Sequence, residues 1–319
     1  MLRALAMALP VLALASTAQA EAEEEATVYE IPGETVFPEG IAYDPDSGHF
    51  YVGATDDGTI FRGEPGTAEM EVFVEGDGED APPTAYGMKV DDHGRLWIAG
   101  GPSGQIFVHD TEDGSRIDSF TVPEAESNFV NDLIVHPDGH VYATDSHAPV
   151  LYRVDASQDE IGELEEWLDL DETPIEYRSG EGVEGVNLNG IEVSADGNHL
   201  ITVQMNTGQL FRIDIETQEV AEIDLGGERV VNGDGLVLEG NRLYVVQLVD
   251  EEIAVIELSE DLASGEVLSR FTHEAFSWPA TAALVNGELV VVNTQFHRRE
   301  TEDPDLPFTV VGIPVDMLD

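Results

Sequence analysis

Six stretches of the chain begin alike, with a polar or small residue just before a short apolar run. They read PEGIAYD, AYGMKVD, VNDLIVH, LNGIEVS, GDGLVLE and PATAALV. We call the second residue of each stretch the slot residue; in chain order the six are Glu39, Tyr86, Asn131, Asn189, Asp234 and Ala280. Four of these side chains carry carboxylate or amide oxygens, which are the groups that bind hard cations.

Two carboxylates and two neutral amides form a donor set that suits Ca²⁺, which takes roughly 6–8 oxygen ligands at about 2.3–2.6 Å and tolerates irregular geometry. We therefore predict a divalent-cation site, calcium in the first instance, on Glu39, Asn131, Asn189 and Asp234. Zinc is disfavoured because no slot residue is His or Cys. The alternative is that the Glu-Gly, Asn-Gly and Asp-Gly pairs are merely turns whose side chains cap the backbone.

The elements that must position these residues are repeated. The slot residues stand at 39, 86, 131, 189, 234 and 280, so their intervals are 47, 45, 58, 45 and 46 residues. Each unit reads as short strands separated by turns such as Asp-Asp-Gly. A period near 45 with several strands is typical of a propeller blade. We predict an all-β, six-bladed β-propeller with four-stranded antiparallel blades.

In a propeller the first strand of each blade lines the central channel, so the slot residues should converge at one mouth of it. The sixth unit offers only three strands, and the alternating segment 26–31 (ATVYEI) is predicted to supply its fourth. The 58-residue interval carries a glycine-rich surplus between Asp171 and Leu188. We expect this connection to overhang the slot residues as a lid.

A second ring of polar residues is expected where the second strand of each blade ends on the same face. Blades three to six place Asp145, Gln204, Gln247 and Asn293 there. These side chains either support the cation or touch substrate, or they are ordinary polar strand ends. His147 and His297 follow just beyond. Each is a candidate proton shuttle or substrate contact, with an inert surface histidine as the alternative.

The first twenty residues, MLRALAMALPVLALASTAQA, have a basic start, an apolar run and a small-residue cleavage site. They predict a secretory signal over 1–20, an acidic leader over 21–25 and a single domain over 26–319. We expect a periplasmic or secreted protein without a membrane segment. The chain has no cysteine, which excludes disulfides and thiolate chemistry.

The formal net charge is −53, from 13 Lys and Arg against 66 Asp and Glu, and Lys89 is the only lysine. Such a surface repels itself in dilute buffer, whereas in molar salt the Debye length falls to about 3 Å and the repulsion is screened. We infer a halophilic source. Nucleic acid is disfavoured as a partner because binding phosphates requires clustered Lys and Arg.

The stretches NDLIVHPDG, NGIEVSADG and DGLVLEGN, together with the glutamate of PEGIAYD, resemble the regucalcin/gluconolactonase family of six-bladed propellers, whose relatives include diisopropyl fluorophosphatase. The resemblance implies a cation, usually Ca²⁺, held by Glu39, Asn189 and Asp234, with Asn131 binding metal or substrate. It places the acid–base or nucleophilic carboxylate on Asp234. The chain departs from the family in having Ile41 where a proline is common, and it has no obvious arginine of the kind that binds sugar hydroxyls.

These observations predict a monomeric, calcium-dependent hydrolase of the gluconolactonase type that acts on a small-molecule lactone or related ester. No GxSxG, HExxH, phosphate-loop or dinucleotide motif offers another chemistry. The alternative is a non-catalytic, calcium-stabilised propeller that binds a ligand or protein on its face.

Overall fold

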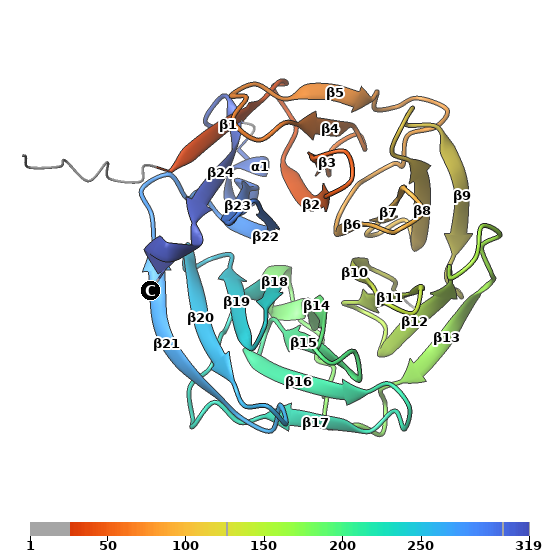
Figure 1. Cartoon of the computed structure of the whole chain (residues 1–319), viewed down its shortest axis with the longest axis vertical. Coiled ribbons are helices and arrows are strands. Elements are labelled where there is room, and N and C mark those ends of the chain that lie inside the picture. Colours follow the sequence, from red (N-terminus) through yellow and green to blue (C-terminus); the bar gives the residue numbers. More distant parts are fainter. Residues whose placement is uncertain (1–25, 126, 302, 319) are drawn as a thin grey trace, which may run out of the picture.

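The computed structural model of the chain describes residues 26–125, 127–301 and 303–318. Six four-stranded antiparallel sheets are arranged as blades around one axis (Figure 1), which confirms the predicted six-bladed propeller. The predicted signal segment 1–20 and leader 21–25 lie outside the described residues. Within the described part of the chain, no helix is long and apolar enough to cross a membrane.

The first three blades follow one another along the chain. Their strands are β2 (Pro38–Asp44), β3 (His49–Ala54), β4 (Ile60–Gly63) and β5 (Glu71–Val74); β6 (Met88–Val90), β7 (Arg95–Ala99), β8 (Gln105–Asp110) and β9 (Arg116–Thr121); and β10 (Val130–Val135), β11 (His140–Asp145), β12 (Val150–Asp155) and β13 (Leu164–Asp169). In each blade the strands lie in chain order, so the first strand is innermost.

Blades four and five keep this order, and blade six differs only in taking one strand from the start of the chain. Their strands are β14 (Leu188–Val193), β15 (His199–Gln204), β16 (Gln209–Asp214) and β17 (Val220–Ile223); β18 (Gly233–Glu239), β19 (Arg242–Gln247), β20 (Glu252–Leu258) and β21 (Gly265–Thr272); and β22 (Pro279–Val285), β23 (Glu288–Asn293), β24 (Phe308–Pro314) and β1 (Thr27–Ile31).

The ring closes through β1, as predicted from the sequence. β1 pairs antiparallel with β24, from Thr27 opposite Gly312 to Ile31 opposite Phe308. Tyr29 and Ile31 are buried in an apolar cluster that also holds Phe50 of blade one. Apolar clusters of this kind, each shared by two neighbouring blades, make up the core of the ring.

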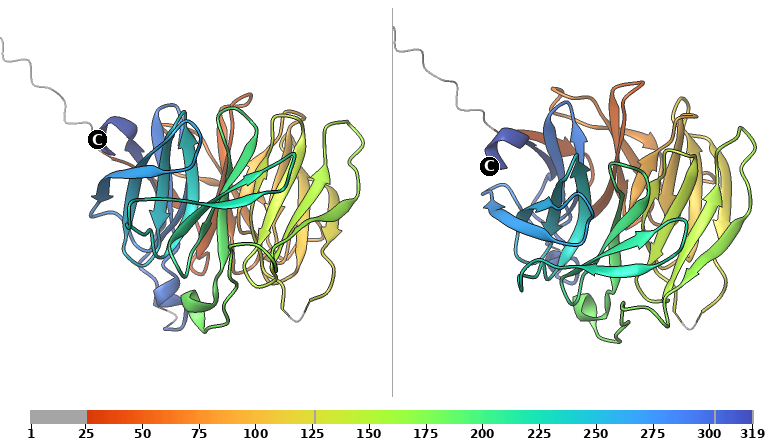
Figure 2. Two further views of the ribbon diagram at one scale, coloured as in Figure 1. Left: turned by 90° about the horizontal axis from the view of Figure 1, so that it is seen from below. Right: turned by 60° about the horizontal axis from the view of Figure 1, so that its bottom comes forward.

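Three short helices complete the fold: η1 (Gly182–Gly185), α1 (Phe296–Arg299) and η2 (Val315–Leu318). Figure 2 shows η1, in green, and α1, in blue, projecting from the same face of the disc. η1 belongs to the long connection before β14, and α1 follows β23. The inner strands begin at this face, because η1 leads directly into the inner strand β14 and the six blades are arranged alike (Figure 2).

We predict that Ile31→Ala lowers the unfolding free energy by about 2–5 kcal/mol, because it leaves a cavity in the cluster that joins blades six and one. Val28→Ala in the same strand is the matched control, since Val28 is 42% exposed. Thermal unfolding followed by circular dichroism in molar salt measures both variants. Equal losses of stability would contradict the role assigned to β1.

Candidate metal centre

The four oxygen-bearing slot residues all lie in the inner strands and are all buried. Glu39 and Asp234 are each 4% exposed, Asn131 is 5% exposed and Asn189 is 3% exposed. Each inner strand packs against the next around the ring, so these residues face a common axis region. The carboxylates of Glu39 and Asp234 lie close enough to repel each other, and Asn189 donates a hydrogen bond to Asp234. These contacts bring Glu39, Asn189 and Asp234 together, and Asn131 stands at the matching position of β10.

A β-bulge, rather than a turn, explains the residues at the slot positions. Pro38 pairs with Ala54 and Ile41 with Val52, so Glu39 and Gly40 together oppose one residue of β3. The same two-against-one irregularity recurs at the slot positions of four other inner strands: β10, β14, β18 and β22. A bulge removes a side chain from the regular alternation and redirects it.

The glycines that follow the slot residues serve close packing between blades. A Cβ at Gly40 would lie 1.8 Å from the carbonyl oxygen of Tyr86, and one at Gly190 would lie 2.4 Å from that of Asp234. Neither glycine has a positive φ. The Glu-Gly and Asn-Gly pairs are thus sites where the next inner strand approaches too closely for any side chain, and the turn interpretation is wrong for them.

Ser146 fixes the orientation of the Asn131 amide. Its hydroxyl donates to the carbonyl oxygen of Leu188 at 2.5 Å and accepts from Asn131 Nδ2 at 2.8 Å. Because Ser146 has only one proton to donate, the amide nitrogen must face it. Asn131 Oδ1 is left buried and without a hydrogen-bond partner.

Glu39 Oε2 is likewise buried without a hydrogen-bond partner. Buried acceptors are normally satisfied, so two unpartnered oxygens among four converging slot residues indicate a missing positive group. No group of three or more His, Cys, Asp or Glu in the described residues forms a metal cluster. A cation here would therefore need the amide oxygens as well as the carboxylates, and that mixed oxygen set fits calcium.

The electrostatics of the site favour an added positive charge. Burial raises the pKa of Glu39 well above its usual value, and the charges of Asp234 and Asp132 raise it further. Burial and the charge of Asp132 also raise the pKa of Asp234 well above its usual value, while the hydrogen bond from Asn189 acts the other way. Two carboxylates held this close are costly unless a proton or a cation lies between them.

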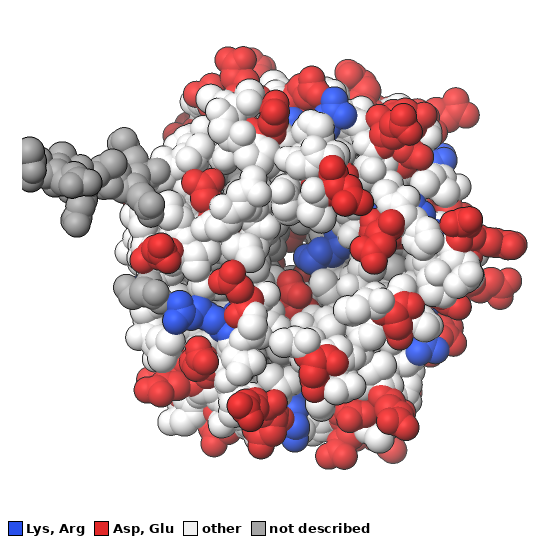
Figure 3. Space-filling view, viewed as in Figure 1, with Lys and Arg blue, Asp and Glu red and all other residues white. Residues whose placement is uncertain are grey.

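Three charged residues next to the slot ring were not predicted from the sequence. Asp132 accepts hydrogen bonds from Leu133 N at 2.8 Å and Ile191 N at 3.2 Å. Lys89 and Glu192 each stand three residues after a slot residue, further along the channel. Burial raises the pKa of Glu192 to about 7, with Lys89 lowering it and Asp132 raising it. Figure 3, which views the opposite face, shows basic and acidic atoms beside a central hollow.

The long connection covers part of the ring. Val183 and Val186, in and just after η1, pack with Trp278 against a small cluster of Met205, Leu248 and the slot residue Ala280. Met205 also contacts the site directly, because Asn189 Nδ2 lies 3.4 Å from its sulfur. The connection therefore lies over the slot residues of blades four and six, where a lid was expected.

The predicted second ring holds loops in place. Asn293 binds the backbone of Ala275 and Ser277, Gln247 binds Val231, and Gln204 Nε2 donates to Glu176 at 2.8 Å. Asp145 accepts from the backbone nitrogens of Phe129, His147 and Ala148. These side chains hold, through hydrogen bonds, the segments that lead into or follow the inner strands. A direct contact with substrate stays a prediction for them.

The two predicted histidines each lie against an aromatic side chain, His147 against Phe129 and His297 against Trp278. His147 contacts Ser127 at 2.9 Å and lines a cavity of about 520 Å³ beside the long connection. The His297 ring lies 5.0 Å from that of Trp278. Neither is joined to the slot ring by a direct hydrogen bond, so a shuttle role also stays a prediction.

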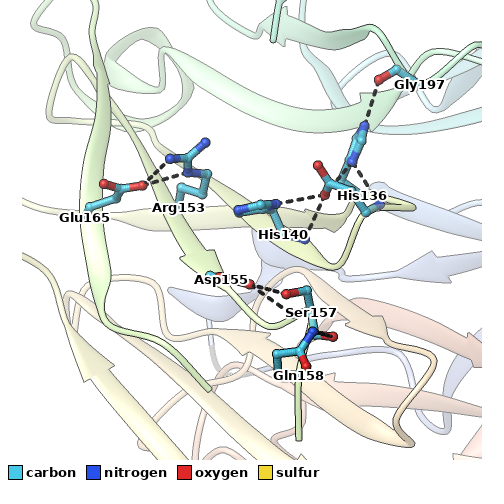
Figure 4. Close-up of polar contacts among 9 residues, drawn as sticks. His136, His140, Arg153, Asp155, Ser157, Gln158, Glu165 and Gly197 are labelled. Atoms are coloured by element: carbon cyan, nitrogen blue, oxygen red, sulfur yellow. Dashed lines mark hydrogen bonds and ion pairs between the residues drawn. The ribbon is translucent and has the colours of Figure 1, made fainter. Parts of the chain in front are cut away.

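A histidine cluster elsewhere in blade three serves the fold. Asp138 accepts from His136 and His140, and His136 Nε2 donates to Gly197 at 2.8 Å (Figure 4). Burial raises the pKa of Asp138, but the bonds from His140 and His136 outweigh it and bring the pKa to about 2. The cluster fixes the turn between β10 and β11 against blade four.

Comparison with known proteins supports the fold. No family model matches the sequence, and no curated protein is detectably similar to it. Among solved structures, a calcium-binding protein, regucalcin, from Agrobacterium tumefaciens has a TM-score of 0.60 at 17% identity over 90% of this chain and 96% of its own. A luciferin-regenerating enzyme has a TM-score of 0.62 at 14% identity, over 91% of this chain and 96% of its own.

Virginiamycin B lyase from Staphylococcus aureus is a further neighbour, with a TM-score of 0.58 at 14% identity over 84% of this chain and 82% of its own. The predicted resemblance to regucalcin-type propellers is confirmed. At such low identities the likeness establishes the fold alone, so the chemistry must be argued from the site itself.

We predict that the Glu192 carboxyl titrates near pH 7 and that Lys89→Met raises its pKa further, because Lys89 is the cation that favours the charged form. Carboxyl-carbon NMR across a pH series measures this, with the exposed Glu266 as an internal control. The raised pKa means that the folded state holds this proton more tightly than the unfolded chain does. Its contribution to stability is therefore lost as pH rises from about 4.3 to about 7. A Glu192 pKa that Lys89→Met leaves unchanged would contradict the arrangement.

We predict that calcium affinity falls as the pH is lowered, because Glu39 and Asp234 must release protons that their raised pKa values retain. Isothermal titration at neutral and mildly acidic pH, in buffers of different ionisation enthalpy, measures affinity and proton release together. Glu39→Gln should weaken binding and reduce the protons released. If calcium binding does not depend on pH and releases no protons, these carboxylates are not the ligands.

Proposed function

We propose that this protein is a secreted, divalent-cation-dependent hydrolase of a lactone or related ester, with calcium as the cation that best suits its donors. The observation that carries the proposal is the buried slot ring, in which Glu39 Oε2 and Asn131 Oδ1 lack partners beside Asp234. The structural neighbours add support, since one is a calcium-binding protein and two others are a luciferin-regenerating enzyme and a lyase.

The four slot residues would hold the cation and divide its ligation between charge and geometry. Glu39 and Asp234 supply the negative charge, while Asn131 and Asn189 supply neutral oxygens that Ser146 and Met205 help to orient. When bound, the cation polarises the ester carbonyl and stabilises the oxyanion that develops on it. The remaining chemistry falls to the side chains themselves.

Asp234 is the residue we assign to proton transfer or nucleophilic attack. Its carboxylate is buried beside Asp132, and because contact with the cation lowers its pKa, it would accept a proton as that contact loosens. As a general base it would take a proton from water; as a nucleophile it would form an acyl intermediate that water then hydrolyses. Val183 and Val186 shield this side of the site from bulk water.

A non-catalytic propeller that uses calcium to hold its inner strands together is the second candidate. It is favoured by the burial of the ring, since each of the four donors is at most 5% exposed. Both candidates require the cation, so the measurement that separates them is turnover.

We expect Asp234→Asn to lower turnover about 100- to 10,000-fold, the range typical of losing a general acid or base. A panel of lactones and aryl esters, assayed in molar salt with Ca²⁺, identifies the substrate and then measures the loss. Glu266→Gln, the same chemical change at an exposed position, should keep full activity. If folded, calcium-loaded wild type turns over nothing on the panel, the non-catalytic candidate is correct.

A further inference from the structure

We propose that Arg299 forms a carboxylate-binding subsite at the edge of the slot ring, so that the preferred substrate is a lactone or ester carrying a carboxylate. That the bound molecule is a substrate rests on the proposed function, whereas the arginine subsite is argued from the structure alone. Arg299 comes from α1, outside the repeated strands, and supplies the kind of cationic group that the repeat positions lack.

The guanidinium of Arg299 is held in place on several sides. Its central carbon lies 4.9 Å from the ring centroid of Phe37 and 4.8 Å from that of Phe296. It donates to Thr55 Oγ1, at the end of the first blade's second strand. A planar group confined in this way loses little freedom when it binds a planar anion.

Tyr86 connects Arg299 to the slot ring. Tyr86 is the slot residue of blade two and is 9% exposed. Burial raises its pKa, the charge of Arg299 and a hydrogen bond from it act in the opposite direction, and Glu39 and Asp234 add to the rise. The phenol therefore lies within reach of both the arginine and the carboxylates proposed to bind the cation.

The charge of Arg299 is not neutralised by the part of the chain that the structure describes. No described carboxylate lies within ion-pairing distance of it, although the chain has 66 Asp and Glu. The adjacent Arg298, by contrast, pairs with Asp305 Oδ2 at 2.7 Å. Arg299 Nε is buried and without a hydrogen-bond partner, so an external anion would meet the terminal nitrogens of the guanidinium. An arginine that pairs with none of the described carboxylates, in so acidic a protein, has capacity for an external anion.

The charge balance of the loaded site points to one negative charge on the substrate. A divalent cation cancels the charges of Glu39 and Asp234, and Lys89 offsets Asp132, which leaves Arg299 with one positive charge at the edge of the ring. A guanidinium binds a carboxylate through two parallel hydrogen bonds. Such a direct contact survives in molar salt, where attraction beyond about 3 Å is screened.

Binding of a non-hydrolysable probe tests the subsite without turnover. Tetrahydrofuran-2-carboxylate and the neutral tetrahydrofuran-2-carboxamide are titrated calorimetrically into calcium-loaded protein. We expect wild type to bind the carboxylate at least about tenfold more tightly, one charge-assisted contact being worth about 1.5–3 kcal/mol. Arg299→Gln should abolish the preference. Arg298→Gln, the matched control on the same helix, should keep it.

Two outcomes of the binding experiment overturn the proposal. A carboxylate that binds through the cation alone keeps its preference in Arg299→Gln, and wild type without any preference has no subsite. Arg299→Lys, which keeps the charge but not the paired donors, should retain part of the preference and serves if Arg299→Gln fails to fold. Turnover of 5-oxotetrahydrofuran-2-carboxylate against its methyl ester separates the two proposals. If neither is hydrolysed while the binding preference holds, the hydrolase proposal fails and the subsite stands.

Discussion

The close approach of neighbouring inner strands is the constraint on which the site depends. At the bulge that opens most of these strands, the slot residue leaves the regular alternation of the sheet, and the residue after it packs directly against the next blade. Gly40 and Gly190 are required because a carbonyl oxygen of the neighbouring strand occupies the space of a side chain. One local distortion, repeated around the ring, thus compresses the inner strands and gathers their polar groups.

That gathering has an electrostatic cost. Glu39, Asp132 and Asp234 are buried near one another, and the charge of Lys89 offsets only part of their repulsion. Isolated buried charges cost several kcal/mol each, so a fold would not retain them for stability alone. The raised pKa values of Glu39 and Asp234 favour a proton between them, and a bound cation would lower the same electrostatic cost. Buried carboxylates with perturbed pKa values are expected at functional sites.

The repeat explains why the fold and the slot residues could be predicted from one sequence. The slot intervals are nearly equal apart from the long third one, and the repeated strand order places Glu39, Asn131, Asn189 and Asp234 at matching positions of their inner strands. The structural role of the glycine in each Asn-Gly pair could not be predicted. A glycine that accommodates a neighbouring backbone and a glycine that makes a turn look alike in sequence. Only contacts between blades distinguish the two.

The remaining site residues were missed for physical reasons that differ. Asp132 directly follows Asn131 and would face away from it in a regular strand; the bulge brings both into the site. Lys89 and Glu192 could have been found, since each stands at the same offset from its slot residue. Arg299 could not, because it lies in a connecting helix whose path no repeat specifies. Conversely, Gln204 and Asn293 showed the right periodicity, but nearby backbone groups occupy their amides.

Closure of the ring by β1 has a consequence for ligand binding. The donors come from blades one, three, four and five, so they meet only when the ring is complete, and completion requires the first strand to pair with the last. A ligand that binds only the closed ring stabilises it by mass action. By the same linkage, weakening the seam between β1 and β24 would lower cation affinity without altering any ligand. In this molecule the junction of the chain ends and the centre of the disc would therefore be coupled sites.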